Sequence, residues 1–338
     1  MLKLSEVRSV HVELTTNCNA RCPMCMRNYR GLDYNSGYPL CELSVVDFKK
    51  ILPPAILPQL TQGVSFNGNL GDFASAKNAL EIVEYLVEHN VPVAINTNGS
   101  LRNSSWWRRL ALPGVKIGFA LDGLAGTHEL YRLDTVWQRV IDHAQAFIDA
   151  GGHAVWRFIP FEHNRHQEQQ CRDLAVSMGF ARFENLYDGR DTGPVFSRTG
   201  EFSHFIGKPW SHSVPSIKPL LENHITWYDA KTYQSTKDTK DLEISCFHKK
   251  NREIYIAADG SVYPCCYLGF YPLTMKHPGN QELAPMVHEN NALQYPLEHC
   301  LEWFETIEQA WSKSSIAEGR PYQCVNTCGK TAFAVTTS

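Results

Sequence analysis

The sequence contains no run of about 18 apolar residues, the length that a membrane-spanning helix needs. Its first residues, Met1-Leu-Lys-Leu-Ser-Glu-Val-Arg, lack the long apolar core of a signal peptide. Net charge is also small, because 32 Lys and Arg against 35 Asp and Glu leave −3, which gives no bulk attraction to nucleic acid or anionic lipid. We therefore expect a cytoplasmic protein with neither a nucleic-acid nor a membrane partner.

Internal repeats and low-complexity tracts are also missing. The 338 residues, 43% hydrophobic and 20% charged, are typical of a globular chain with one large domain or a large and a small one. Eleven cysteines are present. In a reducing compartment, that number argues against a disulfide framework and favours metal ligation.

The apolar pattern of the first 190 residues alternates between strand-like and helix-like segments. Strands are expected at Ser9–Leu14, Gly63–Phe66, Val91–Asn96, Val115–Leu121, His153–Pro160 and Ala181–Leu186. Helices are expected at Ser44–Ile51, Ser75–Asn90, Thr135–Ala150 and His166–Met178, the third with Val136, Val140, Ala144 and Phe147 on one face. This alternation implies parallel strands with right-handed crossovers. We predict an α/β fold with a partial (β/α)6 barrel, whose active site lies at the carboxyl ends of the strands.

The rest of the chain follows a different pattern. Residues 191–240 lack a clean period and are expected to connect the barrel, 1–190, to a small cysteine-rich extension at 241–338. A β-hairpin is expected in the extension, with Glu253–Ala257 and Ser261–Tyr263 joined at Asp259-Gly260. The insert at 200–235 is either a packed linker or a cover over the site, in which case its wall residues are Trp210, His212, Trp227 and Tyr228.

Three cysteines, Cys18, Cys22 and Cys25, form a C-x3-C-x2-C motif directly after the first expected strand. Three thiolates leave one iron of a four-iron cluster without a protein ligand, whereas electron-carrying clusters usually have four cysteines. The alternative is a zinc site, but zinc sites usually pair two such knuckles and no second pair lies near Cys25. The motif therefore indicates chemistry at an open iron.

The motif resembles that of the radical S-adenosylmethionine (SAM) superfamily. The resemblance implies a [4Fe-4S] cluster whose open iron chelates SAM and whose electron cleaves it to a 5′-deoxyadenosyl radical. Met24 stands where the superfamily often has an aromatic residue, and a methionine side chain can also lie against adenine.

Later strand ends carry further matches to this family. Asp72, with Asn69 as a substitute, stands where the family holds the ammonium group of the cofactor, although glutamate is usual there. Thr97 and Asn98, in Thr97–Gly99, resemble the ribose-binding pattern. Asp122-Gly123, followed by His128 and Arg132, resembles a signature of maturase-type members, with Ala120 replacing the usual serine.

The fifth strand carries Arg157 in an otherwise apolar run. An unpaired guanidinium in a core strand is costly, so Arg157 is expected to meet either the cofactor carboxylate or an internal ion-pair partner. His163, Asn164 and His166 follow on the loop, where they either reach substrate or are ordinary loop residues.

A second cysteine set, Cys246, Cys265, Cys324 and Cys328, resembles the SPASM and Twitch extensions of the family. The resemblance implies one auxiliary iron–sulfur cluster, a [4Fe-4S] cluster, with a structural zinc as the alternative. Cys266 faces away from Cys265 on a strand, and Cys300 is the reserve ligand. Cys41 and Cys171 match no motif and are expected to be core thiols. A second interpretation of Cys171 is that it donates a hydrogen atom to a substrate radical.

The resemblance implies a radical SAM oxidoreductase of maturase type. Such an enzyme abstracts hydrogen from a substrate C–H bond, relays an electron through its auxiliary cluster and receives electrons from a donor such as flavodoxin or ferredoxin. The expected outcome is net oxidation or modification of a peptide or protein side chain, although residues 1–30 do not resemble a leader-peptide recognition domain. The alternatives are a dehydrogenase of a small alcohol or sugar and, in another class, a non-enzymatic iron–sulfur electron-transfer protein.

Overall fold

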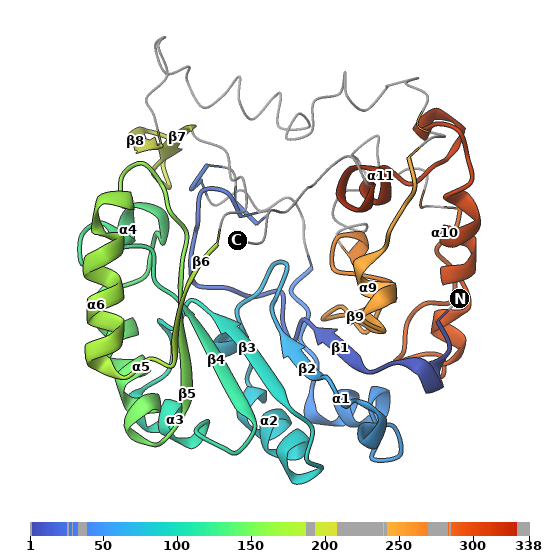
Figure 1. The fold of residues 1–338 in the computed structure, drawn as a ribbon, viewed down its shortest axis with the longest axis horizontal. Coiled ribbons are helices and arrows are strands. Elements are labelled where there is room, and N and C mark those ends of the chain that lie inside the picture. Colours follow the sequence, from blue (N-terminus) through green and yellow to red (C-terminus); the bar gives the residue numbers. More distant parts are fainter. Residues whose placement is uncertain are drawn as a thin grey trace. The chain divides into compact units, whose positions relative to one another are not determined.

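A computed structural model describes residues 2–25, 27–28, 30–32, 39–186, 193–207, 239, 242–269, 283 and 285–329 (Figure 1). The described residues form two compact units. One comprises those in 1–12, 46–62 and 223–338, and the other those in 13–45 and 63–222.

The second unit is built on five parallel strands. They are β2 (Gly63–Phe66), β3 (Val93–Thr97), β4 (Val115–Ala120), β5 (His153–Phe158) and β6 (Arg182–Asn185), and they lie side by side in chain order. Every neighbouring pair is parallel. All five carboxyl ends therefore meet at the same edge of the sheet, where an α/β protein of this kind places its site.

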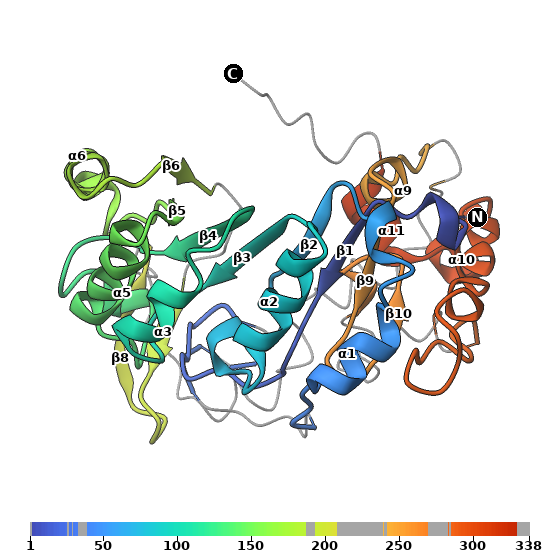
Figure 2. The same cartoon turned by 90° about the horizontal axis from the view of Figure 1, so that it is seen from below.

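Helices cover one side of these strands, as Figures 1 and 2 show. They are α2 (Ala79–Glu88), α3 (Ser104–Arg109), α4 (His128–Tyr131), α5 (Trp137–Asp149) and α6 (Glu168–Met178), with 3-10 turns at Phe73–Ser75 and Arg165–Gln167. Aromatic side chains fill the layer between helices and strands: Trp107 of α3 lies 5.3 Å and Phe147 of α5 lies 6.2 Å from Phe119 of β4, centroid to centroid. These aromatic contacts pack α3 and α5 against β4.

The first unit contributes three strands, paired in the order β10-β9-β1. β1 (Ser9–Val12) pairs parallel with β9 (Glu253–Ile256), which pairs antiparallel with β10 (Val262–Tyr263). Gly260, with φ +86°, makes the turn between β9 and β10. The helical segments are α1 (Val45–Ile51, in this unit from 46 on), α9 (Phe247–Lys250), α10 (Phe304–Ala310), α11 (Tyr322–Cys328) and the 3-10 turns Leu4–Glu6, Leu57–Gln59, His299–Leu301 and Ile316–Glu318.

The predicted strands, helices and C-terminal hairpin are confirmed, with ends that differ by a few residues. Val136 is a correction: it precedes α5 and is 48% exposed, so it does not share the buried face of that helix. Three elements were not predicted: α3, α4 and the antiparallel hairpin of β7 (Gly193–Phe196) and β8 (Phe202–Ile206). That hairpin lies within the segment expected to be a connection.

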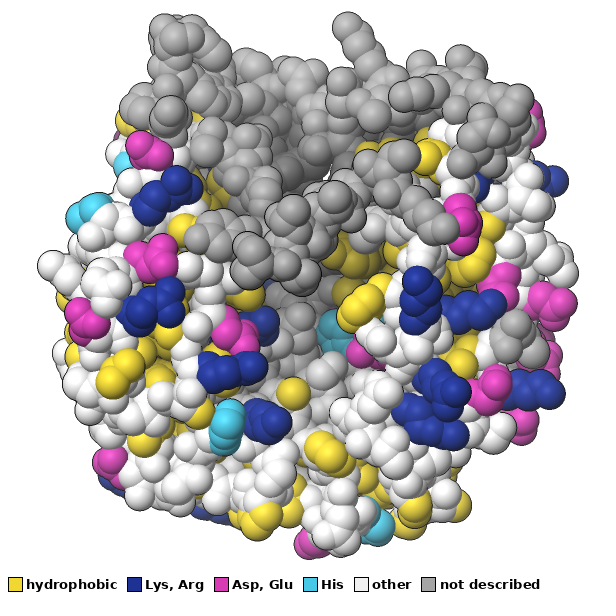
Figure 3. Space-filling model, in the orientation of Figure 1, with side chains coloured by type: hydrophobic (Ala, Val, Ile, Leu, Met, Phe, Trp, Pro, Cys, Tyr) yellow, Lys and Arg dark blue, Asp and Glu magenta, His cyan; other side chains and the backbone are white. Residues whose placement is uncertain are grey.

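The proposed wall residues, Trp210, His212, Trp227 and Tyr228, lie outside the described residues, and the division at 190 and 240 stays a prediction. No described helix is long and apolar enough to cross a bilayer. On the face drawn in Figure 3, basic and acidic side chains are interspersed.

Candidate cofactor site

The three N-terminal cysteines lie on the loop that follows β1 in the chain. Cys22 is buried, and Cys18 and Cys25 are half-buried. Backbone bonds from Cys25 N to Cys22 O and from Asn28 N to Cys25 O, both 2.9 Å, close two successive turns. The thiols pack against an apolar cluster that includes Tyr131. One compact, backbone-bonded segment thus presents all three thiols.

A glycine-rich turn after β2, residues 67–72, packs directly on the segment that precedes the cysteine loop. A Cβ built on Gly71 would lie 1.7 Å from the carbonyl oxygen of Thr15, so only glycine fits at this position. Asp72 N donates to Asn17 O at 2.9 Å. The turn and the start of the cysteine loop are therefore held at a fixed separation.

Glu13 secures the same turn from the other side. Its side chain is 3% exposed, and its Oε1 accepts hydrogen bonds from Leu70 N at 2.6 Å and Gly71 N at 2.9 Å. Glu13 belongs to none of the motifs in the sequence. The available signal was a carboxylate between Val12 and Leu14, since a buried charge in an apolar run needs partners.

Asp72 links the ends of β2 and β3. Its carboxylate accepts hydrogen bonds from Thr97 Oγ1 at 2.9 and 3.0 Å, Asn98 N at 2.7 Å and Ala74 N at 2.9 Å. Burial raises the pKa of Asp72, and these hydrogen bonds act in the opposite direction. The structure therefore brings together three predicted site residues, Asp72, Thr97 and Asn98. The contact of an ammonium group with Asp72, or with half-buried Asn69, stays a prediction.

Asn98 connects the end of β3 to the cysteine loop. Its Nδ2 lies 3.6 Å from Cys18 Sγ and donates to Asn19 Oδ1 at 3.1 Å. Its Oδ1 accepts from the backbone N of Ser100 at 2.9 Å and from Ser100 Oγ at 2.7 Å, which fixes the amide orientation. An N–H group is therefore aimed at the Cys18 sulfur from a neighbouring strand end.

Arg132, directly after α4, makes the equivalent connection to Cys22. Its Nε pairs with Asp122 Oδ2 at 2.6 Å, and its Nη1 lies 3.7 Å from Cys22 Sγ. Burial acts to lower the pKa of Arg132, but the charges of Asp122, Cys22 and Tyr131 and the hydrogen bond to Asp122 together outweigh it and raise that pKa. The other oxygen of Asp122, a fully buried residue, accepts from Ile159 N at 2.7 Å.

His128 holds this ion pair in place. Its Nδ1 accepts from Asp122 N at 3.2 Å, and its Nε2 lies 3.0 Å from Thr135 Oγ1. Because the Thr135 hydroxyl donates to Arg132 O at 2.6 Å, Nε2 must carry the proton and donate. Burial, followed by the charge of Arg132, lowers the pKa of His128 to about 3, so the ring stays neutral. His128 is a positioning residue.

Arg157 has an internal partner. Its Nε lies 3.3 Å from Glu184 Oε2 on β6, and its Nη1 donates to Asn96 Oδ1 on β3. A Cβ on Gly118 would lie 2.6 Å from Arg157 Cδ, so a glycine in β4 makes room for the side chain. The ion-pair alternative is therefore present, and a contact with a cofactor carboxylate stays a prediction.

The four C-terminal cysteines proposed as ligands influence one another electrostatically. Cys328 donates a hydrogen bond to Cys246, which lowers the pKa of Cys246 and raises that of Cys328. Burial raises the pKa of Cys265, and the charges of Cys266, Cys324 and Cys246 add to the increase. Cys324 likewise acts on Cys328. These four thiols therefore lie in one neighbourhood of the first unit.

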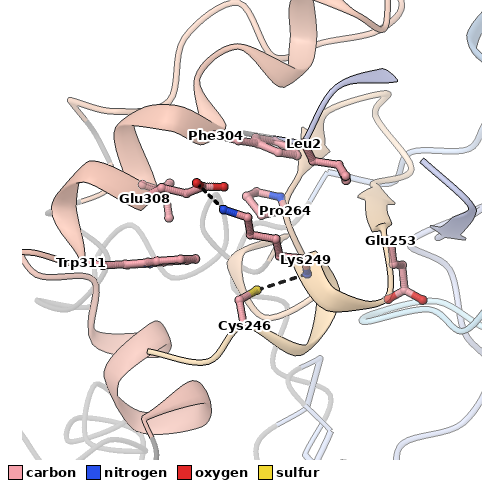
Figure 4. A pocket seen from close by; sticks show the side chains of 9 residues that line it. Leu2, Cys246, Lys249, Glu253, Pro264, Phe304, Glu308 and Trp311 are labelled. Carbon is pink, nitrogen blue, oxygen red and sulfur yellow. Dashed lines mark hydrogen bonds and ion pairs between the residues drawn. The ribbon is translucent and has the colours of Figure 1, made fainter. Parts of the chain in front are cut away.

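A pocket opens beside Cys246, as Figure 4 shows. Lys249 Nζ pairs with Glu308 Oε2 at 2.6 Å and lies 5.8 Å from the centroid of the Trp311 ring. The backbone N of Lys249 lies 3.4 Å from Cys246 Sγ. Cys246 therefore stands at the wall of an opening whose other lining residues are Leu2, Glu253, Pro264, Phe304 and Ile307.

The remaining cysteines differ from these sets. Burial raises the pKa of Cys300 to about 11, with no other cysteine contributing. Burial likewise raises the pKa of Cys171 to about 12, as expected of a core thiol. Cys41 is half-buried. Cys300 therefore shows no electrostatic link to the four proposed auxiliary ligands, and Cys266 acts on Cys265, its neighbour in the chain.

No protein-family model and no curated protein sequence matches this chain. Solved structures do match. SuiB of Streptococcus suis bound to the precursor peptide SuiA has a TM-score of 0.55 and 17% identity over 88% of this chain. anSMEcpe with bound SAM has a TM-score of 0.51 and 17% identity, covering 90% of this chain and 80% of that one. Bound to SAM and the Cp18Cys peptide, anSMEcpe has a TM-score of 0.50 and 17% identity, covering 95% and 88%.

SuiB and anSMEcpe are radical SAM enzymes. This chain has their fold. The α/β class and the family likeness predicted from the sequence are thereby confirmed at the level of the fold. The chain spans 65% of the length of SuiB.

The donor set at the strand ends fits a four-iron cluster. Cysteine thiolates are the usual ligands of such clusters, and hydrogen bonds to their sulfurs tune them. Cys18 and Cys22 each face such an N–H group, from Asn98 and Arg132. Within the described ranges, no three His, Cys, Asp or Glu side chains are grouped to hold a single metal ion. The ligands of a cluster bind different iron atoms and are spread more widely than those of a single ion.

Proposed function

We propose that this chain is a radical SAM enzyme. In this proposal, Cys18, Cys22 and Cys25 hold a [4Fe-4S] cluster whose open iron binds SAM. The observation that carries the proposal is the pair of N–H groups, one from the end of β3 and one beyond β4, that face Cys18 and Cys22. These groups face a loop with three thiols, whereas a protein that only carries electrons usually closes its cluster with four cysteines.

The side chains around the thiols have separable roles in this proposal. Asn98 and Arg132 direct N–H groups toward the sulfurs of Cys18 and Cys22, and such groups would tune a cluster held by these sulfurs. Asp72 and Thr97 hold the ends of β2 and β3 so that the cofactor meets a preformed surface. When bound, the cluster and SAM together supply hydrogen-atom abstraction from an unactivated C–H bond.

An auxiliary [4Fe-4S] cluster on Cys246, Cys265, Cys324 and Cys328 completes the proposal. Its support is that the chain on either side of Cys246 and Cys328 is paired: Ile244 bridges Gly329, and Ser245 N donates to Cys328 O at 2.9 Å. The effects of Cys246 and Cys324 on the pKa of Cys265 agree with this arrangement. These four thiols would hold the cluster, and the chemistry that it would supply is acceptance or relay of the electron left after hydrogen abstraction. A small reducing protein, such as a flavodoxin or ferredoxin, supplies the electron that starts the reaction.

The proposed substrate is a peptide or protein side chain that undergoes net oxidation or modification. The support is that SuiB has been solved with its precursor peptide SuiA and anSMEcpe with the Cp18Cys peptide. Both match most of the present chain. The substrate class thus follows from likeness in fold and is proposed on that basis.

Production of 5′-deoxyadenosine tests the function. The chain is reconstituted anaerobically with iron and sulfide, then given dithionite and SAM. We expect the wild type to release 5′-deoxyadenosine and Cys22→Ala to release none. The matched control is Cys41→Ala, which removes a half-buried thiol outside both motifs and should keep the activity. A wild type that binds iron but releases no 5′-deoxyadenosine would support the electron-carrier alternative.

A further inference from the structure

Asp134 joins the cysteine loop to the β7–β8 hairpin. Its Oδ2 pairs with Arg21 Nε at 2.5 Å and with Arg198 Nη2 at 2.5 Å, and its Oδ1 accepts from Arg21 Nη2 at 3.1 Å. Arg21 directly precedes Cys22, and Arg198 lies in the turn between β7 and β8. One carboxylate therefore bridges two segments that are far apart in the chain, and its contact with Arg21 is the strong two-bond form.

Backbone groups attach the same loop to its surroundings on both sides. Arg21 N donates to Leu133 O at 3.0 Å, and Phe196 N of β7 donates to Arg30 O at 2.8 Å. The Arg21 side chain also spans the loop, because its Nη1 donates to Gly31 O. The loop is thus closed on itself and fixed to β7.

The hairpin also packs on the side of the loop that carries the thiols. Val195 of β7 and Ile206 of β8 are buried in the apolar cluster that contains Cys22. Cys18 and Cys25 pack against the same cluster. Apolar side chains of the hairpin therefore shield the sulfurs that would hold the iron–sulfur cluster.

The hairpin has an attachment of its own. His204 Nε2 on β8 donates to Leu130 O of α4 at 2.8 Å, and His204 Nδ1 lies 3.0 Å from Ser203 Oγ. Because α4 and Asp134 belong to the segment that follows β4, the hairpin is bound to that segment at two places. It is therefore a fixed support for the cysteine loop.

The backbone of Asp134 is left-handed, with φ +65°. Among residues other than glycine, aspartate and asparagine adopt this conformation most readily, and it still costs free energy. Such residues are kept in place by their surroundings and concentrate at functional sites. The side chain of Arg21 is only 11% exposed and that of Asp134 is 30% exposed, so their ion pair is stronger than a surface pair.

We propose that the β7–β8 hairpin clamps the cysteine loop in the conformation that retains the iron–sulfur cluster, and that Asp134 is the positioning residue of this clamp. The inference rests on the proposed function. The loop supplies every protein ligand of the N-terminal cluster, so a local opening of the loop would expose that cluster and release it. The clamp lowers the population of such open states.

The test measures how fast the chelator bathophenanthroline removes iron from the reconstituted full chain, under anaerobic conditions and without SAM. Asp134→Asn removes the charge but keeps a residue that tolerates the left-handed backbone. Arg198→Met breaks only the contact with the hairpin, and Arg198→Lys retains a charged donor. Arg109→Met is the control, because it removes an exposed ion pair, with Glu84 at 2.9 Å, that lies between α3 and α2.

We expect Asp134→Asn to release about four iron atoms per chain about tenfold faster than the wild type does, with the iron of the proposed auxiliary cluster keeping its wild-type rate. Arg198→Met should speed the same release by about threefold, and Arg198→Lys should stay within about twofold of the wild type. The double variant Asp134→Asn with Arg198→Met should be no faster than Asp134→Asn, because Arg198 acts through Asp134. Arg109→Met should change nothing.

Three results would overturn the inference. An unchanged rate in Asp134→Asn would mean that the carboxylate does not hold the loop. Equal acceleration of all the iron would mean a general loss of stability. Additive effects of the Asp134 and Arg198 changes would mean that the hairpin does not act through Asp134. Failure of the proposed function is a different observation, in which the wild type itself takes up no iron on the N-terminal cysteines.

Discussion

Replacing Asp122 by asparagine tests whether the buried ion pair behind Cys22 organises the site. Asp122 is fully buried, and its two oxygens are divided between Arg132 Nε at 2.6 Å and Ile159 N at 2.7 Å. An asparagine side chain has almost the same shape but only one oxygen. Its amide N–H groups must then face either the guanidinium or the backbone N–H of Ile159, and neither of these can accept a hydrogen bond.

The expected cost follows from leaving the Arg132 charge unpaired. Removing one partner of a buried ion pair costs about 3–5 kcal/mol. At about 2.1 cal/mol/K per residue, unfolding of 338 residues carries an entropy of roughly 0.7 kcal/mol/K. Asp122→Asn should therefore lower the thermal midpoint by about 4–7 °C, measured by scanning calorimetry at matched iron content.

A double-mutant cycle separates the pair from other effects. Arg132→Met alone should also destabilise the chain, because it leaves the Asp122 carboxylate short of a partner. Asp122→Asn combined with Arg132→Met should cost less than the sum of the two single changes by about 1–3 kcal/mol. Additive costs, or a loss of less than about 1 kcal/mol for Asp122→Asn, would refute the reasoning, because the two groups would then not depend on each other.

Three further changes have definite expected outcomes. Gly71→Ala should cost about 1–3 kcal/mol by overpacking against a carbonyl oxygen and should weaken SAM binding. The control is Gly151→Ala, because a Cβ at Gly151 meets no neighbour. It should cost only the strain of a left-handed backbone, about 1–2 kcal/mol, and leave the SAM affinity unchanged. Equal SAM affinities in the two variants would contradict a role of Gly71 in the site. A hydrogen bond from Arg21 lowers the pKa of Asp134. The contribution of this pair to the stability of the fold is therefore present above about pH 4 and is lost as the pH falls further. Asp134→Asn should therefore flatten the acid side of a plot of thermal midpoint against pH, and an unchanged slope would count against the pairing. Cys265→Ser should reduce the bound iron from about eight to about four atoms per chain, and Cys300→Ala should leave it at about eight. Equal iron content in the two variants would argue against the auxiliary site.

The sequence was sufficient for β2 to β5 because each contains apolar and β-branched residues and is bounded by polar turns, whereas β6, Arg182–Asn185, has a weaker pattern with no β-branched residue. Their order along the chain also indicated which strand ends would share an edge. The same reasoning gave no sign of α3, whose six residues are too few for a helical period to show. It also missed the β7–β8 hairpin, because residues 193–206 have no clean alternation.

The supporting groups of the site depend on contacts between residues far apart in the chain. Glu13 bonds backbone groups 57 and 58 positions away, and Asn98 reaches a thiol 80 positions away. A motif identifies the thiols but not the groups that face them. His128 illustrates the limit: the resemblance marked it as part of a signature, while its role in holding Asp122 and Arg132 follows only from the bonds at its two nitrogens.

The hydrogen bonds of Asp72 clarify how a shorter side chain can stand where glutamate is usual. A carboxylate offers about four acceptor sites. Three donors use them here: the Thr97 hydroxyl, shared between both oxygens, and the backbone N–H groups of Asn98 and Ala74. The donors keep the carboxylate close to the backbone and lock β2 to β3, and their four contacts use both acceptor sites of each oxygen. Only the shared Thr97 hydroxyl can give up one contact without breaking a backbone bond, so the predicted contact with a SAM ammonium hydrogen requires that hydroxyl to withdraw to a single oxygen.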